Sequence, residues 1–514
     1  MEAISQPVRG RLSTMWEEKR VIIICFLIGF AQFQYGYDSA AVAGFQSMPG
    51  FLRVFGYPEP HITIGYNIST KVQRLIQSLM NVGGLVASFG VYALGPRASR
   101  RLGIWIACAV GLVAISVQIG STTIGALYAG RFLLGVSNAF YLTFSVTYMS
   151  EIAPAHLRGS VVGMVTFHTS LGALFGILVD NYTNESLERK SYQIPLGVMY
   201  IIPLFLATTL IFLPDTPRYY ISRGEHDNAV LSIRKTRGLT NMNHILAEVS
   251  DIQAAWDKEQ ELHGSAQIMD MFRGSDLRRT LITFGASVGQ TATGVVFLAG
   301  YSVYFYVQAR IGTPFVWVMV GLAIALTGNM GSFPAMRFLN RRPLLITCSI
   351  ISSIMMFAMA IVYTKSALGS SSAGKALVGL SIVYTWIYGV GQGPVLWAIT
   401  SEIPSQRLRS QTVGIASGIN FIFAWLCSFF TPYFINHDAL NWGPKYGYIW
   451  GASNVILVLW IFFFVPETKG RSLEQLDELF QKGVPTWKFE GYVTDHQLVD
   501  AAADKEVEGE IGKE

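Results

Sequence analysis

The sequence predicts an all-α membrane protein with twelve transmembrane helices, arranged as two six-helix halves joined by a cytoplasmic helical linker. Hydrophobic residues make up 51% of the 514 positions and charged residues only 14%, whereas soluble domains carry about 25% charged residues. Apolar stretches of about 20 residues, the length that crosses a bilayer, recur along the chain, and short charged motifs recur in both halves. The expected spans are residues 21–45, 74–95, 103–120, 124–149, 159–180, 192–213, 279–307, 313–338, 343–363, 376–400, 411–434 and 446–465.

The distribution of Lys and Arg predicts the orientation, because short loops on the cytoplasmic side of a membrane are enriched in them. Basic residues cluster before the first span, after the second, eighth and tenth spans, and throughout the long 214–278 segment. Both termini are therefore expected in the cytoplasm. The Asn-x-Ser/Thr sequons at Asn67, Asn181 and Asn184 fall in loops that are expected to face outside, where they can be glycosylated.

The expected segments follow from these spans. They are a cytoplasmic tail (1–20), an N-terminal half (21–213), a cytoplasmic helical linker (214–278), a C-terminal half (279–465) and a cytoplasmic C-terminal tail (466–514).

Several function classes are disfavoured by composition. The net charge of +5 is better explained by basic cytoplasmic loops than by binding to nucleic acid. The four cysteines lie singly inside apolar stretches, so they are expected to be buried hydrophobic residues, not disulfides or metal ligands. Because no catalytic set or metal cluster has usable spacing, we expect neither an enzyme nor a cofactor or bound metal.

An internal repeat divides the chain. Glu402 and Arg409 follow Glu151 and Arg158 by 251 residues, and both pairs sit in similar Ser-Glu-Ile motifs. Arg100 and Arg101 after the second span likewise correspond to Arg341 and Arg342 after the eighth. Two related six-span halves around a central cavity are typical of secondary transporters. We predict that these eight charged residues form a cytoplasmic gate that holds the two halves together and opens when they rock apart.

Six motifs, in order, resemble the sugar porter family of the major facilitator superfamily over about residues 20 to 485. They are Tyr35-Gly36-Tyr37-Asp38, Gly130-Arg131 through Gly135, Ser150-Glu151 through Gly159, Pro214-Asp215-Thr216-Pro217-Arg218, Gly391-Gln392-Gly393-Pro394 and Pro466-Glu467 through Arg471. Within this family, the chain looks closer to the fungal maltose and α-glucoside permeases in Ser401 to Thr412, Thr431-Pro432-Tyr433 and Asn441-Trp442-Gly443. The resemblance implies a major facilitator fold and symport of a sugar-like solute with protons by alternating access.

Asp38 is the most informative single residue, because a carboxylate within a spanning helix is costly and is by default a functional hypothesis. The resemblance implies that Asp38 is the proton-coupling carboxylate and that Arg131 of the fourth span is its partner. The alternative is a structural ion pair or a carboxylate that reaches the membrane surface.

The expected sugar site departs from the family pattern. Compared with the family pattern, this sequence keeps a Gln, a Trp and an Asn. It has shorter or apolar side chains where the family has further amide side chains. The kept positions are Gln290, Trp397 and Asn420, and the replaced ones are Thr166, Thr291, Val296 and Ala325. Fewer hydrogen-bonding groups indicate a less polar or larger solute than a hexose. The alternative within transport is a different kind of solute, namely a polyol, an organic acid or a secondary metabolite. A nutrient sensor built like a transporter is the other alternative.

The remaining expectations concern partners and location. We expect a monomer in the lipid bilayer of the plasma membrane. Its expected ligands are a small solute, a carbohydrate, and protons, and the proton gradient is expected to supply the energy.

Overall fold

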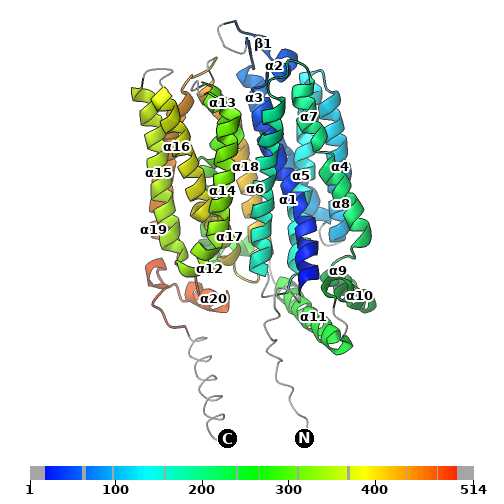
Figure 1. The fold of residues 1–514 in the computed structure, drawn as a ribbon. Helices are drawn as coiled ribbons and strands as arrows, with labels where there is room; N and C mark the ends of the chain where they lie inside the picture. The colour runs from blue at the N-terminus through cyan, green and yellow to red at the C-terminus, as the bar shows by residue number, and fades with distance from the viewer. Residues whose placement is uncertain are drawn as a thin grey trace, which may run out of the picture.

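The computed structural model describes residues 18–60, 65–94, 98–154, 158–238, 241–264, 267–308, 312–366, 371–436, 438–471 and 473–494. Figure 1 shows a bundle of long helices that run roughly parallel, with the N-terminal half on one side and the C-terminal half on the other. The predicted all-α fold of two six-span halves is confirmed.

The N-terminal half holds the first six spans. They are α1 (Lys19–Phe45), α3 (Thr70–Leu94), α4 (Arg100–Gly120), α5 (Ile124–Ile152), α6 (Arg158–Thr183) and a sixth span made of α7 (Lys190–Val198) and α8 (Ile201–Phe212).

The C-terminal half holds the other six. They are α12 (Gly274–Ala292) with α13 (Val295–Gln308), α14 (Pro314–Phe338), α15 (Arg341–Lys365), α16 (Ser371–Ile387) with the π-helical turn η3 (Tyr388–Gln392) and α17 (Gly393–Glu402), α18 (Arg409–Ile435), and the 3-10 turn η4 (Gly443–Tyr446) leading into α19 (Gly447–Phe464).

The two ends of the bundle differ in character (Figure 1). At one end, which we call the hairpin face, lie α2 (Pro49–Phe55) and the short antiparallel pair β1 (Tyr57–Pro58) and β2 (Tyr66–Asn67). The opposite end is the linker face, which carries the elements between the halves and after the last span. These are α9 (Pro217–Ser222), α10 (His226–Arg237), α11 (Met242–Gly264), η2 (Ile268–Phe272), α20 (Leu473–Gln481) and η5 (Thr486–Lys488). Helix α1 begins at the linker face, so its first residues and α20 lie at the same end of the bundle (Figure 1).

Eleven helical segments of the described chain are long and apolar enough to cross a membrane, and α3 is the twelfth span by its 25-residue length and its place in the bundle. Gln73 and Gln77 are buried on α3. Since α3 packs between α5 of its own half and α18 of the other half, these side chains face protein and not lipid.

Three helix pairs form the seam between the halves: α3 with α18, α6 with α14, and α1 with α13. Within the N-terminal half, α1 and α6 pack most closely. A side chain at Gly36 would place its Cβ 1.9 Å from the carbonyl oxygen of Thr169 on α6, so glycine is required for this approach. Small residues permit such backbone contact between membrane helices.

The seventh span, predicted as one helix over 279–307, is broken at Gly294. Gly294 has φ +92°, a conformation that costs glycine little, and a Cβ there would also lie 2.8 Å from Trp450. The break exposes the carbonyl of Thr293, which accepts hydrogen bonds from Tyr384 Oη and Asn454 Nδ2, each at 2.8 Å. Irregular backbone inside a membrane is tolerated where the protein satisfies its polar groups in this way.

Candidate functional site

Asp38 and Arg131 form an ion pair in the interior of the N-terminal half. Arg131 Nη1 on α5 donates to Asp38 Oδ1 on α1 at 2.6 Å, and both side chains have no exposed surface. Asn138, two turns further along α5, places its amide nitrogen 3.5 Å from the other carboxylate oxygen. Removing either charge would leave the other buried without a partner, which is strongly unfavourable.

Arg131 also binds α3. Its Nε donates to the carbonyl oxygen of Ile76 at 3.1 Å, and its Nη2 lies 3.3 Å from Met80 Sδ. The residues that follow Ile76 and Met80 on α3 contact the other half. Gln77 Nε2 donates to the Gly300 carbonyl oxygen of α13 at 3.2 Å. Asn81 Nδ2 donates to Ser428 Oγ of α18, also at 3.2 Å. Helix α3 therefore contacts the ion pair on one face and the C-terminal half on the adjacent face.

The residues expected at the solute site lie on both halves. Gln290 and Thr291 end α12 one turn before the break, and the Gln290 amide nitrogen is buried with no partner among the described residues. Trp397 on α17 is 44% exposed, and the Asn420 amide oxygen on α18 is also buried and unpartnered. Free amide groups of this kind are available to a ligand with hydroxyl groups.

The replaced positions have different surroundings. Thr166 on α6 is exposed, and Val296 on α13 is half-buried. Ala325 on α14 packs against η3, where a Cβ at Gly389 would lie 3.3 Å from the Ala325 carbonyl oxygen. Within the described chain, no hydrogen bond joins any two of the predicted solute residues.

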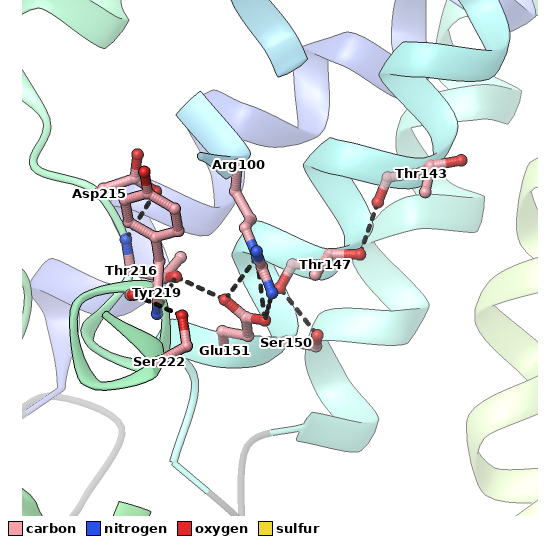
Figure 2. Close-up of polar contacts among 9 residues, drawn as sticks. All are labelled: Arg100, Thr143, Thr147, Ser150, Glu151, Asp215, Thr216, Tyr219 and Ser222. Carbon is pink, nitrogen blue, oxygen red and sulfur yellow. Dashed lines mark hydrogen bonds and ion pairs between the residues drawn. The ribbon is translucent and has the colours of Figure 1, made fainter. Parts of the chain in front are cut away.

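On the linker face, two of the predicted gate residues of the N-terminal half, Arg100 and Glu151, lie in one cluster (Figure 2). Ser99 caps α4 by accepting the Leu102 amide at 3.0 Å, which fixes Arg100 in the first turn. Arg100 binds both oxygens of Glu151, with Nη2 to Oε1 at 2.9 Å and Nε to Oε2 at 3.2 Å. Thr216, which follows the sixth span, donates its hydroxyl to the same carboxylate at 2.5 Å.

The second copy of this cluster lies in the C-terminal half. Arg341 pairs with Glu402 and donates from Nη1 to Thr468 Oγ1 at 3.0 Å. The backbone amides of Arg341 and Arg342 donate to the two oxygens of Glu467 at 3.1 and 2.9 Å, so that a carboxylate caps the positive end of α15.

Each cluster stays within its own half. Four of the eight predicted gate residues form the pairs Arg100–Glu151 and Arg341–Glu402, but among the described residues no ion pair or hydrogen bond joins the two halves at the linker face. Neither Arg101 nor Arg409 forms an ion pair with another described residue. Arg158 begins α6, and its side chain lies outside the described residues.

Polar contacts between the halves concentrate toward the hairpin face. Thr70, the first residue of α3, donates its backbone amide to Asp438 Oδ2 at 3.1 Å, and its hydroxyl donates to Asp438 Oδ1. Asn436 Nδ2 donates to Thr70 Oγ1 at 3.0 Å and to Gln73 Oε1 at 2.8 Å. Asn329 Nδ2 on α14 donates to Ser170 Oγ on α6 at 2.5 Å, nearer mid-helix. The hairpin face is therefore closed across the seam.

The three sequons all lie at the hairpin face. Asn67 is only 5% exposed and donates its amide nitrogen, the atom that would carry a glycan, to Glu59 at 2.8 Å. Asn181 and Asn184 lie at and just after the end of α6 and are half-buried. The Asn184 amide nitrogen also donates, to the Asn181 carbonyl oxygen at 2.6 Å, so Asn181 is the best placed of the three to carry a glycan in the folded protein.

Asp180 is a buried carboxylate that the sequence reasoning did not select. It lies in the last turn of α6, has no exposed surface, and neither of its oxygens has a hydrogen-bond partner among the described residues. The signal was available in the sequence, because Asp180 is the last residue of the apolar stretch 159–180. Its place at the end of the stretch made it resemble a loop residue.

Comparison with known proteins agrees with this architecture. Residues 24–480 match the profile of the sugar (and other) transporter family. The chain belongs to this family. It is therefore a multi-pass membrane transporter of the major facilitator superfamily, as predicted, and not an enzyme.

The chain is similar to named transporters and solved structures of this type. It is 26% identical to the major facilitator-type transporter ecdD of Aspergillus rugulosus over 90% of this chain and 87% of that protein. It is 27% identical to the galactose transporter of Saccharomyces cerevisiae over 95% of this chain and 86% of that protein. A partially occluded inward-open structure of the xylose transporter XylE from E. coli matches with a TM-score of 0.73, at 19% identity, over 88% of this chain and 100% of that chain.

Proposed function

We propose that the protein is a proton-coupled symporter of a sugar or sugar-like solute that works by alternating access. The observation that carries the proposal is the buried Asp38–Arg131 ion pair, which lies within a spanning bundle and is joined through α3 to the seam between the halves. The relatives include a galactose transporter, and XylE is described as a proton:xylose symporter in a structure that matches with a TM-score of 0.71, at 20% identity, over 90% of this chain and 99% of that chain.

The linker face is assigned to the cytoplasm and the hairpin face to the outside, because the basic residues gather at the linker face. With this orientation both termini are cytoplasmic. The membrane that we propose for the protein is the plasma membrane. The closed seam at the hairpin face then corresponds to an inward-facing state, in which the solute site is reached from the cytoplasm.

Coupling follows from the bonds that Arg131 makes. With Asp38 ionised, Arg131 is shared between the carboxylate on α1 and the Ile76 carbonyl on α3. A proton on Asp38 removes the charge attraction, so Arg131 is held by α3 alone and α1 is released from it. Since the adjacent face of α3 carries Gln77 and Asn81 to the other half, protonation changes the relative free energies of the two states of the seam. A solute that favours the same transition is then transported together with the proton.

The solute is proposed to be less polar or larger than a hexose. Gln290, Trp397 and Asn420 supply two amides and one aromatic surface, which suit the hydroxyl groups and the apolar C–H face of a sugar ring. Thr166 and Thr291 offer shorter side chains at two further positions, so that a polyol, an organic acid or a secondary metabolite is the alternative within transport.

A nutrient sensor is the second candidate, because the chain is 26% identical to the high glucose sensor RGT2 of Saccharomyces cerevisiae over 93% of this chain. The chain spans only 62% of that sensor's length. Accumulation of a solute against its gradient would decide for transport.

The test is uptake in proteoliposomes with and without an inward proton gradient, after a screen of solutes in yeast that lacks its own hexose transporters. We expect accumulation of the identified solute only with the gradient. Asp38→Asn should abolish accumulation and leave solute exchange within about threefold of the unmodified protein. Thermal unfolding of the variant serves as the folding control, and proton-driven accumulation by Asp38→Asn would refute the assignment.

A further inference from the structure

We propose that Asp180 is a second proton-binding site, loaded from the outside, whose protonation is linked to closure of the hairpin face. The proposal rests on the alternating access proposed above, but it concerns a carboxylate remote from the Asp38–Arg131 pair in its contacts. Asp180 lies on α6 at the seam between α1 of the same half and α14 of the other half.

The carboxyl group fits into a space that only glycine leaves open. A Cβ at Gly44 on α1 would lie 1.9 Å from Asp180 Oδ2 and 3.2 Å from the ring of Phe315 on α14. Phe315 is itself 8% exposed and Asp180 is fully buried. The carboxyl group is therefore enclosed by a glycine of its own half and an aromatic ring of the other half.

No charge compensates this carboxylate. Among the described residues, no ion pair or hydrogen bond reaches either of its oxygens. Tyr37 on α1 is the titratable side chain near it, and its hydroxyl donates elsewhere, to the Pro195 carbonyl oxygen of α7 at 3.0 Å. The other carboxylate of α1, Asp38, is occupied by Arg131. Of the charged groups that follow α6, Glu188 and Lys190 pair with one another in solvent, and Glu185 is exposed. Arg189 donates to the Ser121 carbonyl oxygen and to the Tyr192 hydroxyl.

An ionised carboxylate without a partner is far costlier in such surroundings than a neutral carboxylic acid. The closed hairpin face is therefore compatible with the protonated acid and opposes the ionised form. When the halves separate at this face, Phe315 withdraws with α14 and water can solvate the charge. A proton taken from the outside thus favours closure, and loss of the proton favours the outward-open state.

The experiment measures the state of the hairpin face without any solute. Spin labels at Leu187→Cys and Lys365→Cys, both exposed and on opposite halves, report its opening as an interspin distance in lipid nanodiscs. The four native cysteines are replaced by alanine, and Asp38→Asn is present throughout so that only other groups titrate. We expect the closed-to-open ratio to rise by up to about tenfold for each unit of pH decrease, the limit for one linked proton.

Three variants in this background decide the outcome. Asp180→Asn, which mimics the neutral acid, should hold the closed distance at every pH between about 5 and 8. Glu188→Gln, on an exposed carboxylate of the same face, should titrate as the parent does. Gly44→Ala, which displaces the carboxyl group, should shift the population toward the open distance even if Asp180→Asn does not fold.

The result that overturns the proposal is an unchanged pH dependence in Asp180→Asn or, if that variant does not fold, no shift in Gly44→Ala. Because the distances require no transport, failure of solute uptake would refute the proposed function and leave this inference standing. Successful proton-driven uptake with no pH-dependent change in the interspin distance would refute this inference and leave the proposed function standing.

Discussion

Asp438 is expected to act as a latch that holds the hairpin face closed. It lies just after α18 in the C-terminal half, yet it accepts the first backbone amide of α3 and the hydroxyl of the same residue, Thr70, in the N-terminal half. The first amides of a helix have no partner within the helix, and a carboxylate at this end also interacts favourably with the helix dipole. The contact can exist only while the halves meet at this face.

The size of the effect follows from these bonds. A hydrogen bond to a charged group contributes about 1.5–3 kcal/mol when it is buried. Asp438 is exposed, so water replaces part of each bond when the halves separate, and we take about 1.4 kcal/mol for the pair as a whole. Asp438→Ala should therefore lower the closed-to-open ratio by about tenfold. Asp438→Asn keeps one acceptor oxygen and should lower it by about threefold.

The assay is the distance between the same two spin labels at Leu187 and Lys365, measured at one fixed pH. Asn436→Ala is a useful companion, because Asn436 bonds both the Thr70 hydroxyl and Gln73 Oε1 across the seam without carrying a charge. Since Asn436 and Gln73 are buried, this variant should lower the closed-to-open ratio at least as much as Asp438→Ala. If Asp438→Ala leaves the distance distribution unchanged, the contact does not contribute to closure. The reasoning about the seam would then be wrong.

Three further predictions concern the break in the seventh span and the solute site. Gly294→Ala should destabilise the protein by about 1–3 kcal/mol because it strains the backbone and crowds the Trp450 side chain, and a lower midpoint of thermal unfolding in detergent would show this. Trp397→Ala should weaken solute binding by about 1–3 kcal/mol through loss of buried aromatic surface, seen as an increase in Kd of about 5-fold to 150-fold by titration calorimetry. Restoring amides with Thr166→Gln, Thr291→Gln and Val296→Asn should shift preference toward hexoses, and a well-expressed triple variant with no gain in hexose uptake would exclude these positions from the site.

The sequence was sufficient for the number of spans, because apolar stretches of the right length predict membrane helices. The repeated Glu and Arg positions predicted one gate that joins the halves, whereas the structure has a separate charged cluster in each half. The span predicted at 74–95 corresponds to α3 (Thr70–Leu94).

Features that depend on contacts between distant segments could not be predicted. Gly294 is one of many glycines in apolar stretches, and only the packing of Trp450 against it shows why this one breaks a helix. The contact of Thr70 with Asp438 joins residues that are 368 positions apart. The seventh and sixth spans were each expected as one helix, and the tenth was expected without its π-helical turn, because irregular turns within spans are stabilised by side chains of other helices.

The placement of the polar contacts argues for how the halves move. The clusters around Glu151 and Glu402 each tie helices of one half to the segment that follows its last span. These bonds can persist in both states, so each half can move as a rigid body, as in rocking transporters. The bonds of Thr70 and Asn81 cross the seam and must break when the hairpin face opens. The linker-face clusters are therefore braces of the individual halves in this state, and a gate that joins the halves there would require new bonds to form between them after rocking.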